Sequence, residues 1–302
     1  MKNISVSKIE SYLTCPLNFK LSYVDKIPQL SSGVTLVGRV IHELVELSMK
    51  EYGRAGKYPD AKTMDDRFEP TWKRLVAKEE SKSWFIGWEW DIPEKEAKAS
   101  YRGLIPVARQ ALEKYRPMML EAGPAVEQRI DLEFESEVGP VPLLGYADFL
   151  DESGLLGDWK STLKGDVSGL AKKSWLQFAG YSFWSWPLVG EENQLCEKVF
   201  LVAGGSEPHV EVEPFVVGPK HREYFAKLVA QVWKGIHYGV YPARDSWKCE
   251  FCPFRGPCRS EVEKPEEKIL CAACGKKLYS GSRFCMHCGQ KVEVLSGGDE
   301  PW

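Results

Sequence analysis

The sequence predicts a sheet with helices packed on it, an α/β or α+β fold, followed by a small metal-bound unit. Polar and apolar residues alternate along residues 126–135, and further apolar runs follow, which indicates neighbouring strands. Apolar residues recur at helical spacing before and after these runs. Two Cys-x2-Cys pairs near the C-terminal end are typical of a metal-bound module.

The N-terminal part is predicted to be mainly helical. Ser7-Lys8-Ile9-Glu10 has the form of a capping box, so a short helix is expected to begin there. Residues 34–52 carry an apolar stripe at helical spacing and predict a second helix. Residues 55–120 are rich in charged and aromatic side chains and are interpreted as a helical insertion, divided into shorter helices by Pro93 and Pro106.

The strands are predicted in the second half of the chain, beginning at Val126. The expected order of the remaining elements is strand 141–150, strand 155–161, helix 173–186, strand 198–203, strand 209–217 and helix 220–238. Strands mixed with helices in this way favour a sheet that is covered by helices.

Composition narrows the class of protein. The 302 residues are 43% hydrophobic and 27% charged, as expected of a soluble globular protein, and no apolar run approaches the ~20 residues of a spanning helix. The start of the chain lacks the apolar core of a signal peptide, so a cytoplasmic protein without a membrane segment is expected. The formal net charge of −3 gives no general attraction for nucleic acid, so any DNA-binding surface must be locally basic.

Asp158-Trp159-Lys160 is the first candidate for chemistry. Residues two apart on a strand face the same side, so Asp158 and Lys160 are expected to point to one place, and Asp148 on the preceding strand would add a second carboxylate. Two acids and a lysine are the parts of a metal-dependent site that cuts phosphodiesters. The acids bind Mg²⁺ or Mn²⁺, and the metal ion and the lysine stabilise the charge that builds up on the phosphate and the attacking water. The alternative is that these charges are solvated strand ends, although the apolar residues beside them favour a position near the core.

Two predicted helices carry further candidates. Gln177 and Tyr181 are four residues apart and therefore share one face of a helix. His42 lies on the helix of residues 34–52, and its imidazole can complete a cation shell made mainly of oxygen ligands. The alternatives are that His42 is a packing residue and that Gln177 and Tyr181 belong to an ordinary helix surface.

Together these motifs resemble the RecB-type nucleases of the PD-(D/E)xK superfamily. The motifs occur in the order of that family: His42 within Gly38–Glu43, Asp148 within Gly145–Asp148, Asp158-Trp159-Lys160, and Gln177-x3-Tyr181. A single motif of this kind is weak, but their order on these element types is specific. The resemblance covers about residues 5–262 and implies an α/β, restriction-endonuclease-like core, with a central mixed sheet flanked by helices.

The resemblance also implies a role for each residue. His42, Asp148 and Asp158 would bind Mg²⁺ or Mn²⁺, and Lys160 would orient or activate the attacking water. Gln177 and Tyr181 would support the site and contact DNA. Glu127 lies on the preceding predicted strand, where some members of the family carry an additional acid.

Cys249, Cys252 and Cys258 provide three closely spaced thiolates, and Cys15 is a candidate fourth that sequence spacing alone cannot pair with them. The resemblance extends to AddB-type nuclease domains and small CRISPR-associated iron–sulfur exonucleases, and it implies a [4Fe–4S] cluster held by these four cysteines. Such a cluster would tie the two ends of the nuclease domain together. In the alternative, Cys15 is a buried apolar residue and the other three cysteines bind zinc with another ligand.

A second cysteine group resembles a zinc ribbon. Cys271, Cys274, Cys285 and Cys288 form two Cys-x2-Cys-Gly knuckles, and four thiolates close a tetrahedral zinc site without His287. So small a unit has little core, and the metal would supply most of its folding free energy. Cys196 is left over and is expected to be buried in a strand. The predicted organisation is a nuclease domain at 1–262, a linker at 263–269, the zinc ribbon at 270–292 and a disordered tail at 293–302.

The predicted function is a Mg²⁺- or Mn²⁺-dependent deoxyribonuclease, and the resemblance implies an exonuclease on single-stranded DNA in repair, recombination or processing. The alternatives are a structure-specific endonuclease and an inactive DNA-binding protein that recruits a partner through the zinc ribbon. No ATP use is expected, since Gly33-x4-Gly38-Arg39 lacks the Lys-Ser/Thr of a phosphate-binding loop. Six basic residues could contact DNA phosphates: Lys164, Lys172, Lys173, Lys248, Arg255 and Arg259. Three tryptophans could stack on bases or simply pack in the core: Trp84, Trp88 and Trp90.

Overall fold

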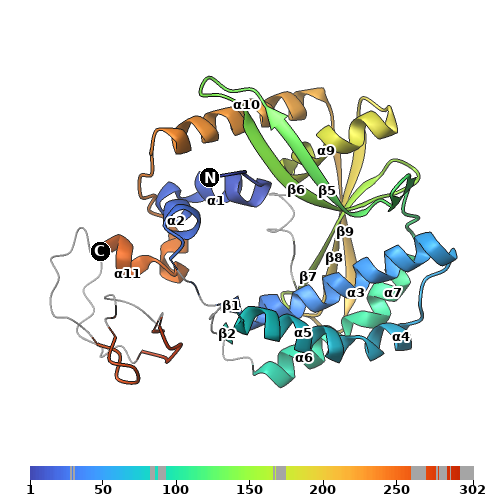
Figure 1. Cartoon of the computed structure of the whole chain (residues 1–302). Coiled ribbons are helices and arrows are strands. Elements are labelled where there is room, and N and C mark those ends of the chain that lie inside the picture. The colour runs from blue at the N-terminus through green and yellow to red at the C-terminus, as the bar shows by residue number, and fades with distance from the viewer. Residues whose placement is uncertain are drawn as a thin grey trace.

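A five-stranded mixed sheet lies at the centre of the structure, a computed structural model of the chain (Figure 1). The described residues are 1–27, 29, 31–81, 86–87, 93–165, 167, 175–259, 270–276, 278, 284–285 and 287–292. The strand order is β5 (Val126–Phe134), β6 (Val141–Leu150), β7 (Leu156–Thr162), β8 (Gln194–Val202) and β9 (His209–Val217). β7 and β8 are parallel, and the other neighbouring pairs are antiparallel. The predicted α/β fold with a central mixed sheet is confirmed.

Helices cover both faces of this sheet, each over its own apolar core (Figure 1). Leu156 and Cys196 are register partners on β7 and β8, and so are Trp159 and Val199, with the two pairs pointing to opposite faces. The face of Trp159 is covered by α3 (Gly33–Ala55), α5 (Phe68–Glu80), α6 (Glu94–Arg102) and α7 (Leu104–Leu112). The face of Leu156 is covered by α1 (Val6–Thr14), α9 (Trp175–Val189) and α10 (Pro219–His237). Cys196 is fully buried there, as predicted.

The start of the first helix differs from the prediction. α1 begins at Val6, and the side chain of Ser5 accepts a hydrogen bond from the backbone N–H of Lys8 at 3.3 Å. The prediction that Ser7 caps this helix is wrong, because the first turn includes the buried Val6 and the cap therefore falls one residue before it.

The predicted insertion is mainly helical in its described part. Besides α5, α6 and α7 it contains α4 (Ala61–Asp66). Pro93 is the residue immediately before α6 and separates it from α5, as predicted. The prediction that Pro106 also breaks a helix is wrong: it lies in the first turn of α7, where its missing N–H would have no helical partner.

Short elements complete the chain. The N-terminal α2 (Pro16–Phe19) follows directly on α1, and its Leu17 N–H donates to the carbonyl of Pro242 at 3.3 Å. The segment after α10 is therefore held against the N-terminal helices. The remaining elements in the described part of the chain are a π-helical turn (Lys20–Val24), β1 (Ser31–Ser32), β2 (Ile86–Gly87), β3 (Met119–Leu120), β4 (Gly123–Pro124), a 3₁₀ turn (Trp247–Phe251) and α11 (Arg255–Arg259). Within the described residues, no helix combines the length and the apolarity needed to cross a membrane.

Gly157 is a position at which the sheet core leaves no space. It pairs with Phe149 across β6 and β7, and a Cβ added to it would lie 1.8 Å from the Phe149 ring. Phe149 is fully buried, so the ring has no free space to move into. We expect Gly157→Ala to lower the free energy of unfolding by about 3 kcal/mol or more, measured by chemical denaturation. In a Phe149→Leu background the same change should cost less, and an equal cost in both backgrounds would contradict this packing.

Candidate active site

The candidate site lies where β6 and β7 separate. The two strands pair only through Phe149 with Gly157 and Leu150 with Leu156. Continuing this register places Asp148 opposite Asp158, at the point where the ladder has ended. A carboxylate oxygen of Asp148 accepts a hydrogen bond from the backbone N–H of Trp159 at 2.8 Å. The Asp148 side chain therefore satisfies a β7 donor at the opening, and both acids are buried within the sheet.

His42 reaches this opening from α3. Its Nε2 lies 2.9 Å from Asp148 Oδ2, and its Nδ1 lies 3.4 Å from Glu127 Oε1. Glu127 has a φ of 49°, in the left-handed region that a residue with a side chain rarely adopts. Such a backbone costs on the order of 1–3 kcal/mol, and residues of this kind cluster at active sites and ligand-binding segments.

Asp158 is held from three elements. Its Oδ1 accepts hydrogen bonds from Lys160 Nζ at 2.8 Å and from Gln177 Nε2 on α9 at 2.7 Å. Its Oδ2 is buried, has no hydrogen-bond partner in the described part of the chain, and lies 3.8 Å from Lys198 Nζ on β8. The side chain of Asp158 is only 2% exposed, whereas that of Lys160 is 42% exposed. Lys160 is therefore open to solvent, whereas Asp158 lies inside the sheet.

The close charges shift several pKa values. Burial opposes a charge on His42, but Asp148 and Glu127 outweigh it and raise the His42 pKa to about 9. Burial and the charge of Asp148 raise the pKa of Glu127 to about 7. Burial and Asp148 also raise the pKa of Asp158, whereas His42 overcomes the effect of burial and lowers that of Asp148. Burial disfavours the ammonium of Lys160, but the two aspartates raise its pKa, and the side chain is protonated at neutral pH.

The donor atoms fit a divalent cation. One donor atom from each of His42, Glu127 and Asp148 lies within 4.8 Å of the other two. The buried Asp158 Oδ2 provides a further carboxylate oxygen without a hydrogen-bond partner among the described residues. Carboxylate oxygens with one imidazole nitrogen suit Mg²⁺ or Mn²⁺.

The structure brings the six sequence-predicted residues of the nuclease motifs into one region. His42, Asp148, Asp158, Lys160 and Gln177 are linked by the contacts above. Tyr181 lies on the same helix as Gln177, packs against Gly145 of β6, and has its pKa raised to about 12 by burial and by the charge of Asp148. The predicted cation ligands are His42, Asp148 and Asp158, whereas the described donors that lie within 4.8 Å of one another are those of His42, Glu127 and Asp148.

Lys198 is a neighbour of the site that sequence reasoning missed. Its side chain is 10% exposed and faces Asp158 from the adjacent strand. A signal was present in the sequence, because a lysine in the otherwise apolar run Lys198–Val202 of a central strand needs a buried partner.

The first cysteine group lies where the two ends of the nuclease region meet. Asn18 connects two of its members, since its backbone N–H lies 3.5 Å from Cys15 Sγ and its Nδ2 lies 3.5 Å from Cys252 Sγ. Cys249 lies in the 3₁₀ turn that ends just before Cys252, and Cys258 lies on the following helix, α11. Asn18 thereby brings the distant Cys15 near Cys252. The four sulfurs of this group are not all within 4.8 Å of one another.

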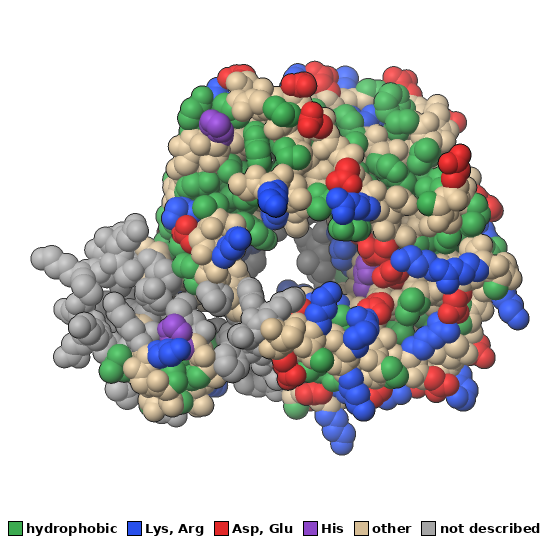
Figure 2. Space-filling view, in the orientation of Figure 1, with side chains coloured by type: hydrophobic (Ala, Val, Ile, Leu, Met, Phe, Trp, Pro, Cys, Tyr) green, Lys and Arg blue, Asp and Glu red, His purple; other side chains and the backbone are tan. Residues whose placement is uncertain are grey.

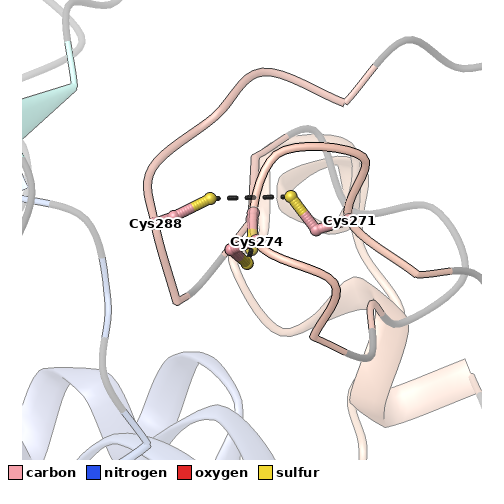
Figure 3. Close-up of side chains that lie close together, drawn as sticks. Cys271, Cys274 and Cys288 are labelled. Atoms are coloured by element: carbon pink, nitrogen blue, oxygen red, sulfur yellow. Dashed lines mark hydrogen bonds between the residues drawn. The ribbon is translucent and has the colours of Figure 1, made fainter.

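The second cysteine group is compact (Figure 3). Cys271 Sγ lies 3.5 Å from Cys288 Sγ, and Cys274 Sγ lies 3.6 Å from Cys285 Sγ. Four thiolates at ~2.3 Å from one zinc ion would be about 3.8 Å apart, so the four sulfurs are spaced for a tetrahedral metal. Gly275 and Gly289 adopt φ values of 67° and 73° and close two matching turns. The side chain of His287 is not part of this group.

The face shown in Figure 2 is hollowed near its middle, and acidic and basic side chains gather along the right and lower borders of the hollow. The proposed base-stacking residues Trp84, Trp88 and Trp90 lie outside the described residues, and so do Lys172 and Lys173. Lys164 is exposed at the end of β7.

One comparison with known proteins identifies the family of this chain. Residues 3–259 match the PD-(D/E)XK nuclease superfamily. No curated protein matches the chain. Among solved structures, a candidate exonuclease from Eubacterium rectale is 12% identical with a TM-score of 0.48, covering 89% of this chain and 91% of that one. SSO0001 is 11% identical with a TM-score of 0.42, covering 87% and 88%. At these values neither likeness bears on activity, whereas the family match spans most of the sequence: the chain belongs to the PD-(D/E)XK nuclease superfamily.

Proposed function

We propose that this nuclease is a Mg²⁺- or Mn²⁺-dependent deoxyribonuclease of the RecB type that removes nucleotides from single-stranded DNA. The observation that carries the proposal is the convergence of His42, Glu127 and Asp148 beside the Asp158–Lys160 pair. The order of the motifs along the chain supports the RecB type, and through it the exonucleolytic use of single strands.

His42, Glu127, Asp148 and Asp158 would hold the cation. When bound, it supplies Lewis-acid stabilisation of the charge that builds up on the phosphate. Lys160 is protonated, so it donates hydrogen bonds to water or phosphate and does not take up a proton. Gln177 shares Asp158 Oδ1 with Lys160 and keeps that carboxylate in place. In the reaction a water oxygen bonds to phosphorus and its proton passes to solvent, while the bond from phosphorus to one sugar oxygen breaks and that oxygen takes up a proton from solvent water.

Incubation of labelled single- and double-stranded DNA with the purified protein tests this function. We expect cleavage with Mg²⁺ or Mn²⁺, faster on single strands, and none with a chelator. Circular single-stranded DNA should remain intact, because an exonuclease needs an end. Cutting of the circle would instead identify an endonuclease with the same chemistry, and a lack of metal-dependent cleavage on any substrate would contradict the proposal.

We also propose that Cys15, Cys249, Cys252 and Cys258 hold a [4Fe–4S] cluster. Four thiolates suit iron–sulfur ligation, and a cluster spreads its ligands wider than a single ion does. The position of Asn18 between Cys15 and Cys252 supports this ligand set. The cluster would stabilise the domain by joining α1 to the segment after α10.

Cys271, Cys274, Cys285 and Cys288 are proposed to bind a structural zinc ion. The buried apolar residues of this unit are few, Leu278 and the cysteines themselves, so the metal would supply much of its folding free energy. The domain limits given above, and a partner-binding role for this zinc ribbon, remain predictions.

Metal analysis of protein purified without oxygen tests both cysteine sites together. We expect about four irons and one zinc per chain, with visible absorption from the cluster, because one ligand set suits a [4Fe–4S] cluster and the other a single zinc ion. Changing Cys271 and Cys274 to serine should remove the zinc and leave the iron and the nuclease activity. Loss of iron in this variant, or zinc in place of iron in the unaltered protein, would contradict the assignment.

A further inference from the structure

Lys198 is a buried cation that the nuclease motifs do not include. It is 8% exposed and is the register partner of Asp158 across the parallel pair of β7 and β8. Its Nζ lies 3.8 Å from Asp158 Oδ2, the oxygen that Lys160 and Gln177 leave uncontacted. The two oxygens of this carboxylate therefore face different lysines.

A lysine in this place is costly for the fold. Burial lowers its pKa, while the charges of Asp158 and of Glu10 on α1 oppose that effect and support the ammonium. The Nζ also lies 5.7 Å from the centroid of the Phe200 ring. An apolar side chain of the same length would pack in a β-strand without the desolvation cost of a charge. Stability alone therefore does not account for a lysine at residue 198.

We propose that Lys198 is a positioning residue for cleavage, which fixes the orientation of the Asp158 carboxylate by attracting Oδ2 while Lys160 and Gln177 hold Oδ1. This inference depends on the proposed nuclease function. Because Lys198 lies on a central strand in register with Asp158, it has little freedom to move relative to it. A carboxylate held at both oxygens cannot rotate away from the cation and the phosphate.

Lys198 differs from a DNA-binding lysine in the exposure of its side chain. The Lys160 side chain is 42% exposed and can reach a phosphate, whereas that of Lys198 is 10% exposed and faces the Asp158 carboxylate. Loss of the Lys198 charge should therefore affect the rate of the chemical step and not the affinity for DNA.

The test compares kcat and KM for a single-stranded oligonucleotide at saturating Mn²⁺ in Lys198→Met, which keeps the length and loses the charge. We expect kcat to fall about 10- to 100-fold with KM changed less than about threefold, as for a misplaced catalytic group. Lys198→Arg, which keeps the charge, should recover at least part of kcat. Lys227→Met is the matched control, since Lys227 is an exposed lysine on α10 paired with Glu223. It should leave both constants unchanged.

Three results would overturn the inference while the unaltered protein still cleaves DNA. They are an unchanged kcat in Lys198→Met, a rise in KM at constant kcat, and a loss of stability with normal kcat for the folded fraction. If Lys198→Met does not fold, Lys198→Gln takes its place under the same expectation. A lack of cleavage by the unaltered protein would instead contradict the proposed function itself.

Discussion

Asp158→Asn is expected to lower kcat for metal-dependent DNA cleavage on the order of 10³-fold or more. Asparagine has nearly the same shape and can still accept a hydrogen bond from Lys160 or Gln177, so the fold should persist. It lacks the negative charge that binds a hard cation and holds the Lys160 ammonium 2.8 Å away. The measurement is the single-turnover rate on labelled single-stranded DNA, with circular dichroism to establish folding.

Asp131→Asn is the matched control. Asp131 lies on β5, its side chain is 64% exposed, and it pairs only with Arg129 among the described contacts. Its replacement removes the same charge without touching the site and should leave the rate unchanged. Equal rates for Asp158→Asn and Asp131→Asn in a nuclease-free preparation would contradict the assignment of Asp158.

The second large effect is expected for Cys15→Ser, which removes the ligand most distant from the others in sequence. We expect loss of most of the iron and of the visible absorption. The free energy of unfolding should fall by about 5 kcal/mol. This is the loop-closure entropy that the cluster removes from the unfolded chain by joining Cys15 to cysteines more than 200 residues away. The close contact of Asn18 with Cys252, which are 234 residues apart, locates this junction. Iron analysis and chemical denaturation under nitrogen measure the two effects.

Cys196→Ala serves as the control for the cysteine change. Cys196 is fully buried in β8 and belongs to the sheet core, so its replacement should cost some stability but retain the iron. Full iron content in Cys15→Ser would contradict the proposed ligand set and favour Cys15 as a packing residue.

The main elements of the fold follow from local patterns. The strands at 141–150 and 209–217 have the predicted bounds, because apolar residues begin and end there together with turn residues. Asp158 and Lys160 could be placed on one face since the side-chain period of a strand is two. His42 could be identified as a candidate cation ligand from its motif, but its approach to Asp148 depends on how α3 packs on the sheet.

Other features depend on tertiary structure that local patterns do not encode. The positive φ of Glu127 is a backbone conformation for which a glutamate gives no local signal. The pairing of Lys198 with Asp158 requires the register of two parallel strands that are separated by α9. The end of the β6–β7 ladder at Phe149 is also a property of the assembled sheet, and it creates the opening in which the acids meet.

The central claim is that His42, Glu127, Asp148 and Asp158 form a pocket for a divalent cation. Titration of the metal-free protein with Mn²⁺, followed by electron paramagnetic resonance, measures this binding without requiring cleavage. We predict saturable binding that is lost in Asp148→Asn and retained in Asp131→Asn. Equal Mn²⁺ binding by Asp148→Asn and the unaltered protein would contradict the claim.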